Sequence, residues 1–363
     1  MAWTERYVTN SGAGAADGTS LANAWSWATM LTSLSSGQRA NVQGTISRTT
    51  ASDTFTNAGT AAAPISIRGI NSSDGDLDAN GRTRGGALVT TNFPVVTYTT
   101  GGLTLPNYMV AEAVSFTSAR TGSTVTAGNN GVLRRCKFAN THASPASAIG
   151  LTSGSNTTIV DDCDATCASS SSSASAFSGT NLVLLRSLAT GNTSGAGCIN
   201  GGGGNQTLIA CVFRDAGYGY VTSGSGELWA CSFRNITNTY ISQGVANGPI
   251  SMQNCVAWGS GGSSKWYNST TSVRHQFQCA NFLGNFGASD TNEGDWPVYG
   301  EVALSADPFT SSSDLTLNDT AGGGADVKAA GYPAYLDGGA WQSQAASGGG
   351  LFLPRGFTGG ISA

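Results

Sequence analysis

The chain has 363 residues, of which 51 are glycine and only 10% are charged, and its formal net charge is -4 at pH 7. Disordered proteins combine high net charge with few hydrophobic residues, and nucleic-acid binders present a basic surface, so the composition argues against both classes. No segment approaches the roughly 20 consecutive apolar residues of a membrane-spanning helix, so we expect no membrane insertion.

The N-terminal region, residues 1–58, is predicted to form a strand and a capping helix. Residues 6–20 indicate a strand followed by a glycine-rich turn. From 20 to 34, Leu21, Trp25, Ala28 and Leu31 recur at helical spacing, and Ser20 is available as the N-cap. We expect this helix to cover the open end of the repeats that follow.

An exposed excursion is predicted at residues 71–84, after a buried strand near residue 65. Its Asp74, Asp76 and Asp78 alternate along the chain, as carboxylates around a calcium ion do. No glutamate follows at the distance found in calcium-binding loops, so we interpret the segment as a solvated loop and expect no metal site.

A repeat of about 24 residues organises residues 59–284, and it is clearest where TLIACVFRD (207–215) recurs as ELWACSFRN (227–235). Extended in both directions, it defines a set of positions that we call the cysteine column: Val114, Cys136, Cys163, Ser187, Cys211, Cys231, Cys255 and Cys279. A period this short fits one coil of a strand-based solenoid and is too short for pairs of helices.

Apolar residues flank the cysteine column, three positions before it and two positions after it. Inward side chains of a strand recur every second residue, so the odd step of three predicts a corner in each coil. We therefore expect a short strand, a tight bend at the residue before the column, a second short strand, and then a Gly/Ser/Asn loop. The predicted bends include Arg135, Asp162, Arg186 and Asn254.

Six of the eight cysteines lie in the column, and Cys167 and Cys198 lie outside it. Stacked cysteines would point into the core in parallel, which is a poor geometry for a disulfide, and buried cysteine packs as a small hydrophobic side chain. We predict buried, reduced thiols. No C-x-x-C pair occurs, so a zinc site is not expected.

Beyond residue 284 the period is lost. Residues 285–344 are predicted to form an irregular closing segment, and residues 345–363 a Gly/Ser linker with an apolar tail. The tail contains Leu351, Phe352 and Phe357, which are candidate docking residues. Its alternative place is against the last coil.

The sequence resembles right-handed parallel β-helix proteins of the pectate-lyase-like superfamily, and within it an uncharacterised phage and bacterial class. The resemblance implies an all-β fold of stacked coils. It covers the chain up to about residue 342, and the motifs that carry it lie near both ends: Tyr7-Val-Thr-Asn-Ser-Gly12, Asp17-Gly-Thr-Ser20, Ala22-Asn-Ala-Trp25, Asp307-Pro-Phe309, Asp326, Gly331 and Leu336-Asp-Gly-Gly-Ala-Trp341.

Catalytic residues of this superfamily do not carry over to the chain. His142 and His275 do not match the Gly-His-Gly stretch of the galacturonan hydrolases. Lyases of this fold use calcium-binding acids and an arginine base, and the candidates here are Asp161, Asp162, Asp164, Arg134, Arg135 and Arg186. Because the signs of the charges alternate between coils, we interpret this set as lateral ion pairs and expect no catalytic residue and no cofactor.

Aromatic residues of the later coils, Trp258, Trp266 and Tyr267, are either platforms for a sugar or a partner protein, or core residues of those coils. We hypothesise a non-enzymatic structural or binding protein of a bacteriophage virion, either a head decoration or a tail-associated spike.

As partners of such a protein we expect other capsid or tail proteins and a host surface glycan, and we expect a homotrimer. Because residues 1–6 lack the pattern of a secretory signal, we expect it to be made in the host cytoplasm and carried on the virion surface. A polysaccharide lyase or hydrolase and a bacterial surface adhesin are the alternatives.

Overall fold

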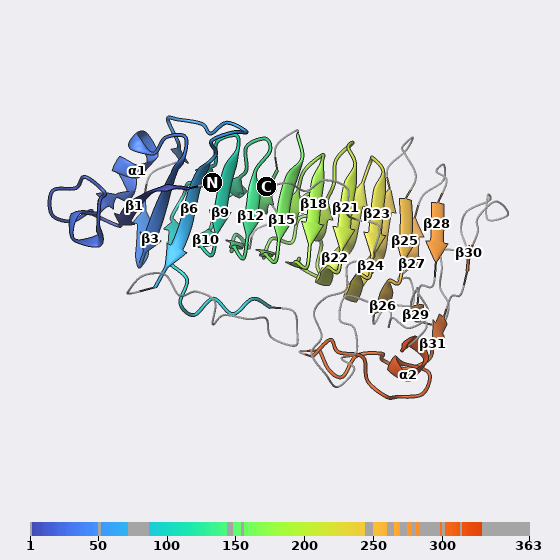
Figure 1. Cartoon of the computed structure of the whole chain (residues 1–363). Coiled ribbons are helices and arrows are strands. Elements are labelled where there is room, and N and C mark those ends of the chain that lie inside the picture. The colour runs from blue at the N-terminus through green and yellow to red at the C-terminus, as the bar shows by residue number, and fades with distance from the viewer. Residues whose placement is uncertain are drawn as a thin grey trace.

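The computed structural model describes residues 2–49, 52–71, 87–143, 148–153, 156–243, 250–259, 265–268, 274–277, 280–282, 298–299, 302–312 and 314–328. The chain winds into a stack of parallel coils, a β-helix that runs the length of the molecule (Figure 1). Two parallel sheets, which we call sheet A and sheet B, form its walls. The predicted fold class, an all-β solenoid, is confirmed.

Sheet A takes one strand from each coil. Its 13 strands, in spatial order, are β2 (Trp25–Ser26), β1 (Thr4–Thr9), β3 (Gln38–Gln43), β6 (Ile65–Ile70), β9 (Met109–Glu112), β12 (Val132–Arg134), β15 (Thr158–Asp161), β18 (Leu182–Leu185), β21 (Gln206–Ile209), β23 (Gly226–Trp229), β25 (Ile250–Gln253), β28 (Arg274–Phe277) and β30 (Val298–Tyr299).

Over the described residues, sheet B has 18 strands and takes two segments from most coils. The segment that directly follows sheet A forms β4 (Thr45–Arg48), β7 (Val95–Tyr98), β10 (Ser115–Ser118), β13 (Lys137–Asn140), β16 (Asp164–Cys167), β19 (Leu188–Thr190), β26 (Val256–Trp258), β29 (Ala280–Phe282) and β31 (Val302–Leu304). The next segment forms β5 (Asp53–Thr54), β8 (Leu103–Thr104), β11 (Gly122–Thr126), β14 (Ala148–Thr152), β17 (Ser175–Ser178), β20 (Gly197–Asn200) and β27 (Lys265–Asn268). In two coils both segments join into one long strand, β22 (Val212–Thr222) and β24 (Ser232–Gln243).

The coil therefore contains a third strand where the sequence predicted only a loop, and that prediction was wrong. The inward residues of these strands stack as well as those of the first two: Val125 pairs in register with Leu103 and Leu151. The connections before them differ in length, so the third strands do not keep a constant distance from the cysteine column. A single period measured from the cysteines could not detect them.

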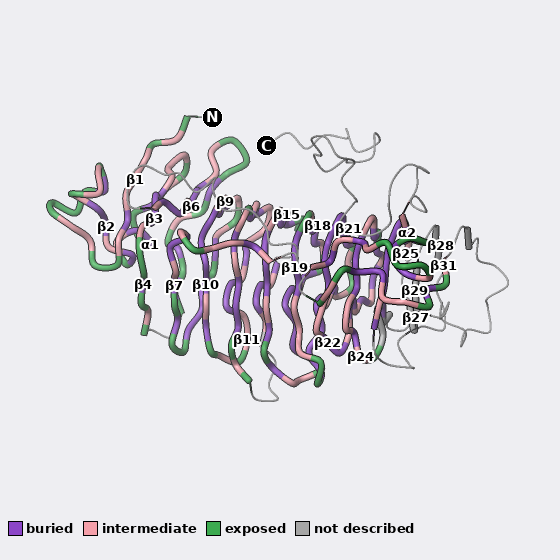
Figure 2. Tube along the Cα trace, turned by 90° about the horizontal axis from the view of Figure 1, so that it is seen from below, coloured by how far each residue is buried: buried purple, intermediate pink, exposed green. Residues whose placement is uncertain are grey.

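Stacking buries a continuous core inside the coils (Figure 2). Parallel pairing sets like residues one above the other, so the rings of Phe116 and Phe138 stack with centroids 5.9 Å apart, and those of Phe213 and Phe233 lie 4.8 Å apart. One coil alone would leave these rings in water, which is why stability depends on neighbouring coils.

The helix at the N-terminal end is shorter than predicted. Helix α1 (Trp27–Ser33) begins after Ser26, whose Oγ accepts the amide of Thr29, while Ser20 precedes only the 3₁₀ turn η1 (Leu21–Asn23). Residues 25–26 pair with β1 as strand β2, and this pairing delays the start of the helix. The buried side chains of α1, including Trp27 and Met30, join the core and cover the first coils as expected.

Two segments far apart in sequence cover the outside of sheet B. The outward residues Leu188, Val212 and Val256 cluster with apolar side chains between Leu304 and Val327, and Ala87 packs against the same cluster. Arg234 donates two hydrogen bonds to the carboxylate of Asp307, at 3.0 and 2.8 Å, so an ion pair fixes the C-terminal segment and its short helix α2 (Gly324–Val327) to the coils. Within the described ranges, no helix is long and apolar enough to cross a membrane.

Candidate functional site

The corner between sheets A and B has the same backbone in successive coils. The residue before each described member of the cysteine column has a φ between 49° and 55°, in the left-handed region: Ala113, Arg135, Asp162, Arg186, Ala210, Ala230 and Asn254. This confirms the predicted bend. Because one left-handed residue reverses the alternation of side chains, the column residue that follows points into the core, and all described members are at most 1% exposed.

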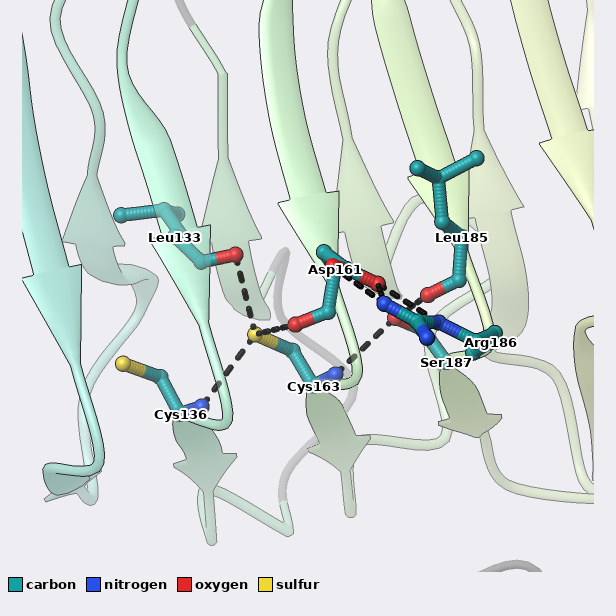
Figure 3. Close-up of polar contacts among 7 residues, drawn as sticks. All are labelled: Leu133, Cys136, Asp161, Cys163, Leu185, Arg186 and Ser187. Atoms are coloured by element: carbon teal, nitrogen blue, oxygen red, sulfur yellow. Dashed lines mark hydrogen bonds and ion pairs between the residues drawn. The ribbon is translucent and has the colours of Figure 1, made fainter. Parts of the chain in front are cut away.

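The buried thiols complete the hydrogen bonding of this corner. The Sγ of Cys163 lies 3.3 Å from the carbonyl of Asp161 and 3.5 Å from the carbonyl of Leu133 in the preceding coil, and it accepts the amide of Cys136 at 3.2 Å (Figure 3). Ser187 takes the same place with its hydroxyl, which donates to the carbonyl of Leu185 at 2.7 Å.

All seven described cysteines are reduced and buried, as predicted, and Cys279 lies outside the described residues. Burial raises the pKa of Cys198 and of Cys231 well above the usual value, so these thiols stay protonated. A thiolate is the form that attacks electrophiles and binds metals, so the raised pKa values indicate structural roles for Cys231 in the column and for Cys198 outside it.

The corner separates the three carboxylates considered for lyase chemistry. Asp161 ends β15 on the outer face of sheet A, Asp162 is the left-handed corner residue, and Asp164 begins β16 on sheet B. Because Cys163 between them points inward, the side chains of Asp161 and Asp164 leave from different sheets. Within the described ranges, no group of three His, Cys, Asp or Glu side chains is placed to hold a metal ion.

Two of these carboxylates have defined partners. Arg186 of the next coil donates to both oxygens of Asp161, with a closest distance of 2.5 Å, which confirms the predicted lateral ion pair. Asp164 is 3% exposed, and its Oδ2 accepts the amide of Leu88 at 2.6 Å, so it anchors the segment that covers sheet B. Arg134 is exposed and stands in register with Glu112 and Asp161.

The structure describes the side chains of only some of the remaining predicted residues. Trp258 ends β26, is half-buried and packs against the apolar cluster on the outside of sheet B. For Trp266, Tyr267 and His275 the structure gives only the backbone, in β27 and β28. Their side chains lie outside the described part, as do residues 72–86 with Asp74, Asp76 and Asp78, and the tail with Leu351, Phe352 and Phe357. His142 is half-buried near the end of β13.

The outer face of sheet A carries a feature that sequence reasoning missed. Two rows of residues point outward there, four and two positions before the cysteine column. In the early coils the first row is aliphatic, with Val110, Val132, Ile159 and Val183, and in the later coils the second row is apolar, with Leu185, Ile209 and Trp229. All except Ile209 are half-buried. Together they form an apolar stripe that crosses the sheet diagonally, and we call it the sheet A stripe.

A buried carboxylate in the first coils was also missed. Asp53 is 4% exposed and accepts hydrogen bonds from Trp27 Nε1 of α1 at 2.8 Å, from Arg48 at 2.8 and 2.9 Å, and from Tyr98 at 3.2 Å. It occupies the inward position that Leu103 takes in the coil with which it pairs in register. Burial acts to raise the pKa of Asp53, but the hydrogen bonds from Arg48 and Trp27 outweigh it and lower the pKa. The network ties the capping helix to the coils.

No family model and no curated protein matches the sequence. Among solved structures, the fold is similar to that of pectate lyase Pel9A, with a TM-score of 0.69 and 14% identity over 93% of this chain and 96% of that chain. The chain has the right-handed parallel β-helix fold of that lyase. At this identity the likeness establishes the fold and not the reaction.

Proposed function

We propose that the protein is a non-enzymatic structural and binding protein of a bacteriophage virion, in which the rigid β-helix presents the sheet A stripe to other virion proteins. The observation that carries the proposal is the contrast on sheet A between the charged and the apolar side chains. The candidate acid Asp161 is held by Arg186 and is separated from Asp164 by the corner, whereas the apolar side chains form one continuous band. Partly exposed apolar bands of this kind are typical of protein interfaces.

A head decoration and a tail-associated spike both fit this arrangement, at the virion surface and as a homotrimer. Mass spectrometry of purified particles of the encoding phage tests the location, and light scattering of the purified protein tests the trimer. The double variant Leu185→Ser, Trp229→Ser should assemble into particles at reduced occupancy while keeping its melting temperature within a few degrees. Absence of the wild-type protein from the particles would refute the proposal.

A polysaccharide lyase is the second candidate, and it is supported by the similarity to a pectate lyase over most of the chain. Incubation with polygalacturonate, with and without calcium, followed by ultraviolet absorbance of unsaturated products, separates the two functions. We expect no product above background. Product formation that is lost in Asp161→Asn but kept in the matched variant Asp215→Asn would establish the lyase and exclude the scaffold.

A further inference from the structure

A groove of about 460 Å³ runs along the turns that return from sheet B to sheet A in the early coils. Three successive turns build it, at residues 55–58, 104–107 and 126–129. Each contributes one rung with the same layout: a buried apolar residue, a small or rigid residue, and an asparagine. The asparagines are Asn57, Asn107 and Asn129.

The sequence of the rungs explains why the surface is hollow here. The buried residue shrinks from Phe55 to Leu105 to Ala127, and these residues are 7%, 1% and 2% exposed. In the third rung Gly128 follows, and a Cβ there would lie 2.4 Å from the carbonyl carbon of Pro106. No side chain fits at that position, so the third rung stays low.

The asparagines at the edge of the groove are fixed in orientation. The Oδ1 of Asn107 accepts the amide of Asn129 at 2.8 Å, and the Oδ1 of Asn129 accepts the amide of Asn156 at 3.0 Å. Their Nδ2 groups have no partner among the described residues and remain available as donors. In the first rung the orientation is reversed: Asn57 Nδ2 donates to the carbonyls of Thr32 and Leu34, so its Oδ1 remains available as an acceptor.

We propose that this groove binds an uncharged oligosaccharide, one sugar unit per rung. The side chains that line it include no charged group, which disfavours uronic acids and phosphorylated glycans. Neighbouring coils are about 4.8 Å apart, the spacing of strands in a sheet, and this is close to the length of one pyranose unit. An extended peptide advances about 3.3 Å per residue and would lose register with the rungs. A sugar also combines apolar ring faces with hydroxyl groups, which matches a lining that mixes apolar residues with threonine hydroxyls and asparagine amides.

The test uses saturation-transfer NMR and calorimetry of the full chain with cellotriose, mannotriose and maltotriose, and with trigalacturonate as the acidic contrast. The double variant Asn107→Asp, Asn129→Asp keeps the acceptor oxygens of the turns, removes the two donors and adds a negative charge at each position. It should weaken binding about tenfold or more, because the modest contributions of two hydrogen bonds are lost together. Ala58→Trp, at an exposed edge of the groove, should abolish binding.

The matched control is Asn181→Asp, because Asn181 Oδ1 accepts the amide of Asn205 at 3.2 Å in a turn outside the groove. It should bind the trisaccharide as the wild type does, and so should the sheet A variant Trp229→Ser. Failure of all three uncharged trisaccharides to bind would overturn the proposal. Tighter binding of trigalacturonate, or an equal loss in Asn181→Asp, would overturn it too. None of these outcomes bears on the virion proposal.

Discussion

The corner from sheet A to sheet B and the turn that returns from sheet B to sheet A are built differently. The corner uses one left-handed residue and one inward thiol or hydroxyl, and it is repeated from Ala113 to Asn254. The return turn changes in length and composition, and three of its copies leave a groove. The comparison indicates that residues inside the corner maintain the stack, while those of the return turn are free to vary for binding.

Removal of a ring from the core should have the largest effect. Phe213 is fully buried two positions after the corner thiol and contacts Phe233. We expect Phe213→Ala to lower the free energy of unfolding by about 3–5 kcal/mol, through lost burial and a cavity. Urea unfolding followed by circular dichroism measures it, with the outward Thr207→Ala as the control, expected within about 0.5 kcal/mol. Equal effects of the two variants would contradict the assignment of the core.

Asp53→Asn should cause the second-largest loss of stability, because it leaves Arg48 without its charge partner beneath α1. Breaking a buried pair costs about 3 kcal/mol. The pKa of Asp53 is lowered in the folded state, so its contribution is present above the unfolded pKa and is lost as the pH falls through the folded pKa. Thermal melts from pH 7 down to pH 2 should therefore show a steeper acid loss in the wild type than in the variant. Parallel curves would contradict the role of this carboxylate.

Arg234→Met tests whether the C-terminal segment is fixed mainly by its contacts with the outer face of the coils. The variant loses the bidentate pair with Asp307 and the contact of its guanidinium with the ring of Phe309, at 5.4 Å. We expect a loss of about 2 kcal/mol, confined to residues 302–328. Hydrogen exchange should speed up in that segment and not in β22 or β24. Arg214→Met, whose ion pair with Asp215 is longer at 3.7 Å, serves as the comparison and should change exchange little.

Introducing a β-branched residue should destabilise the corner more than the return turn. Ala210 has a φ of 53°, and a β-branched side chain is strained in that region, so Ala210→Val should cost about 1–2 kcal/mol. Ala58→Val in the exposed return turn should be nearly neutral. Differential scanning calorimetry measures both. A neutral Ala210→Val would show that the corner backbone is less constrained than its repetition suggests.

Loss of the lateral ion pair should have the smallest effect. Arg186 is 47% exposed, so solvent screens its pair with Asp161. We expect Arg186→Gln to change the stability by less than about 1 kcal/mol, and less still in 1 M salt. Chemical unfolding at two salt concentrations checks this. A loss of several kcal/mol would mean that the charges of the corner are coupled into a network.

The repeat made the core and the corner predictable. The spacing of Cys211 and Cys231 placed both thiols inward, and the odd step before them located the bends, because each coil contacts chiefly its neighbours and like residues must stack. The start of α1 could not be predicted from periodicity, since pairing of Trp25 with Val8 in β1 claims the residues before it. The sheet A stripe escaped notice because it combines two different rows of the repeat.

By itself the sequence determined the solenoid, its reduced thiols and the side-by-side pairing of Asp161 with Arg186. Only the tertiary structure decided that Asp53 is buried under Trp27 and that Asp307 pairs with Arg234. The same is true of the groove, which forms where the buried residue becomes smaller over three successive turns. The physical reason is the separation along the sequence of the residues that make contact. A repeat specifies contacts between neighbouring coils, whereas contacts between segments with no shared period depend on where the whole stack places them.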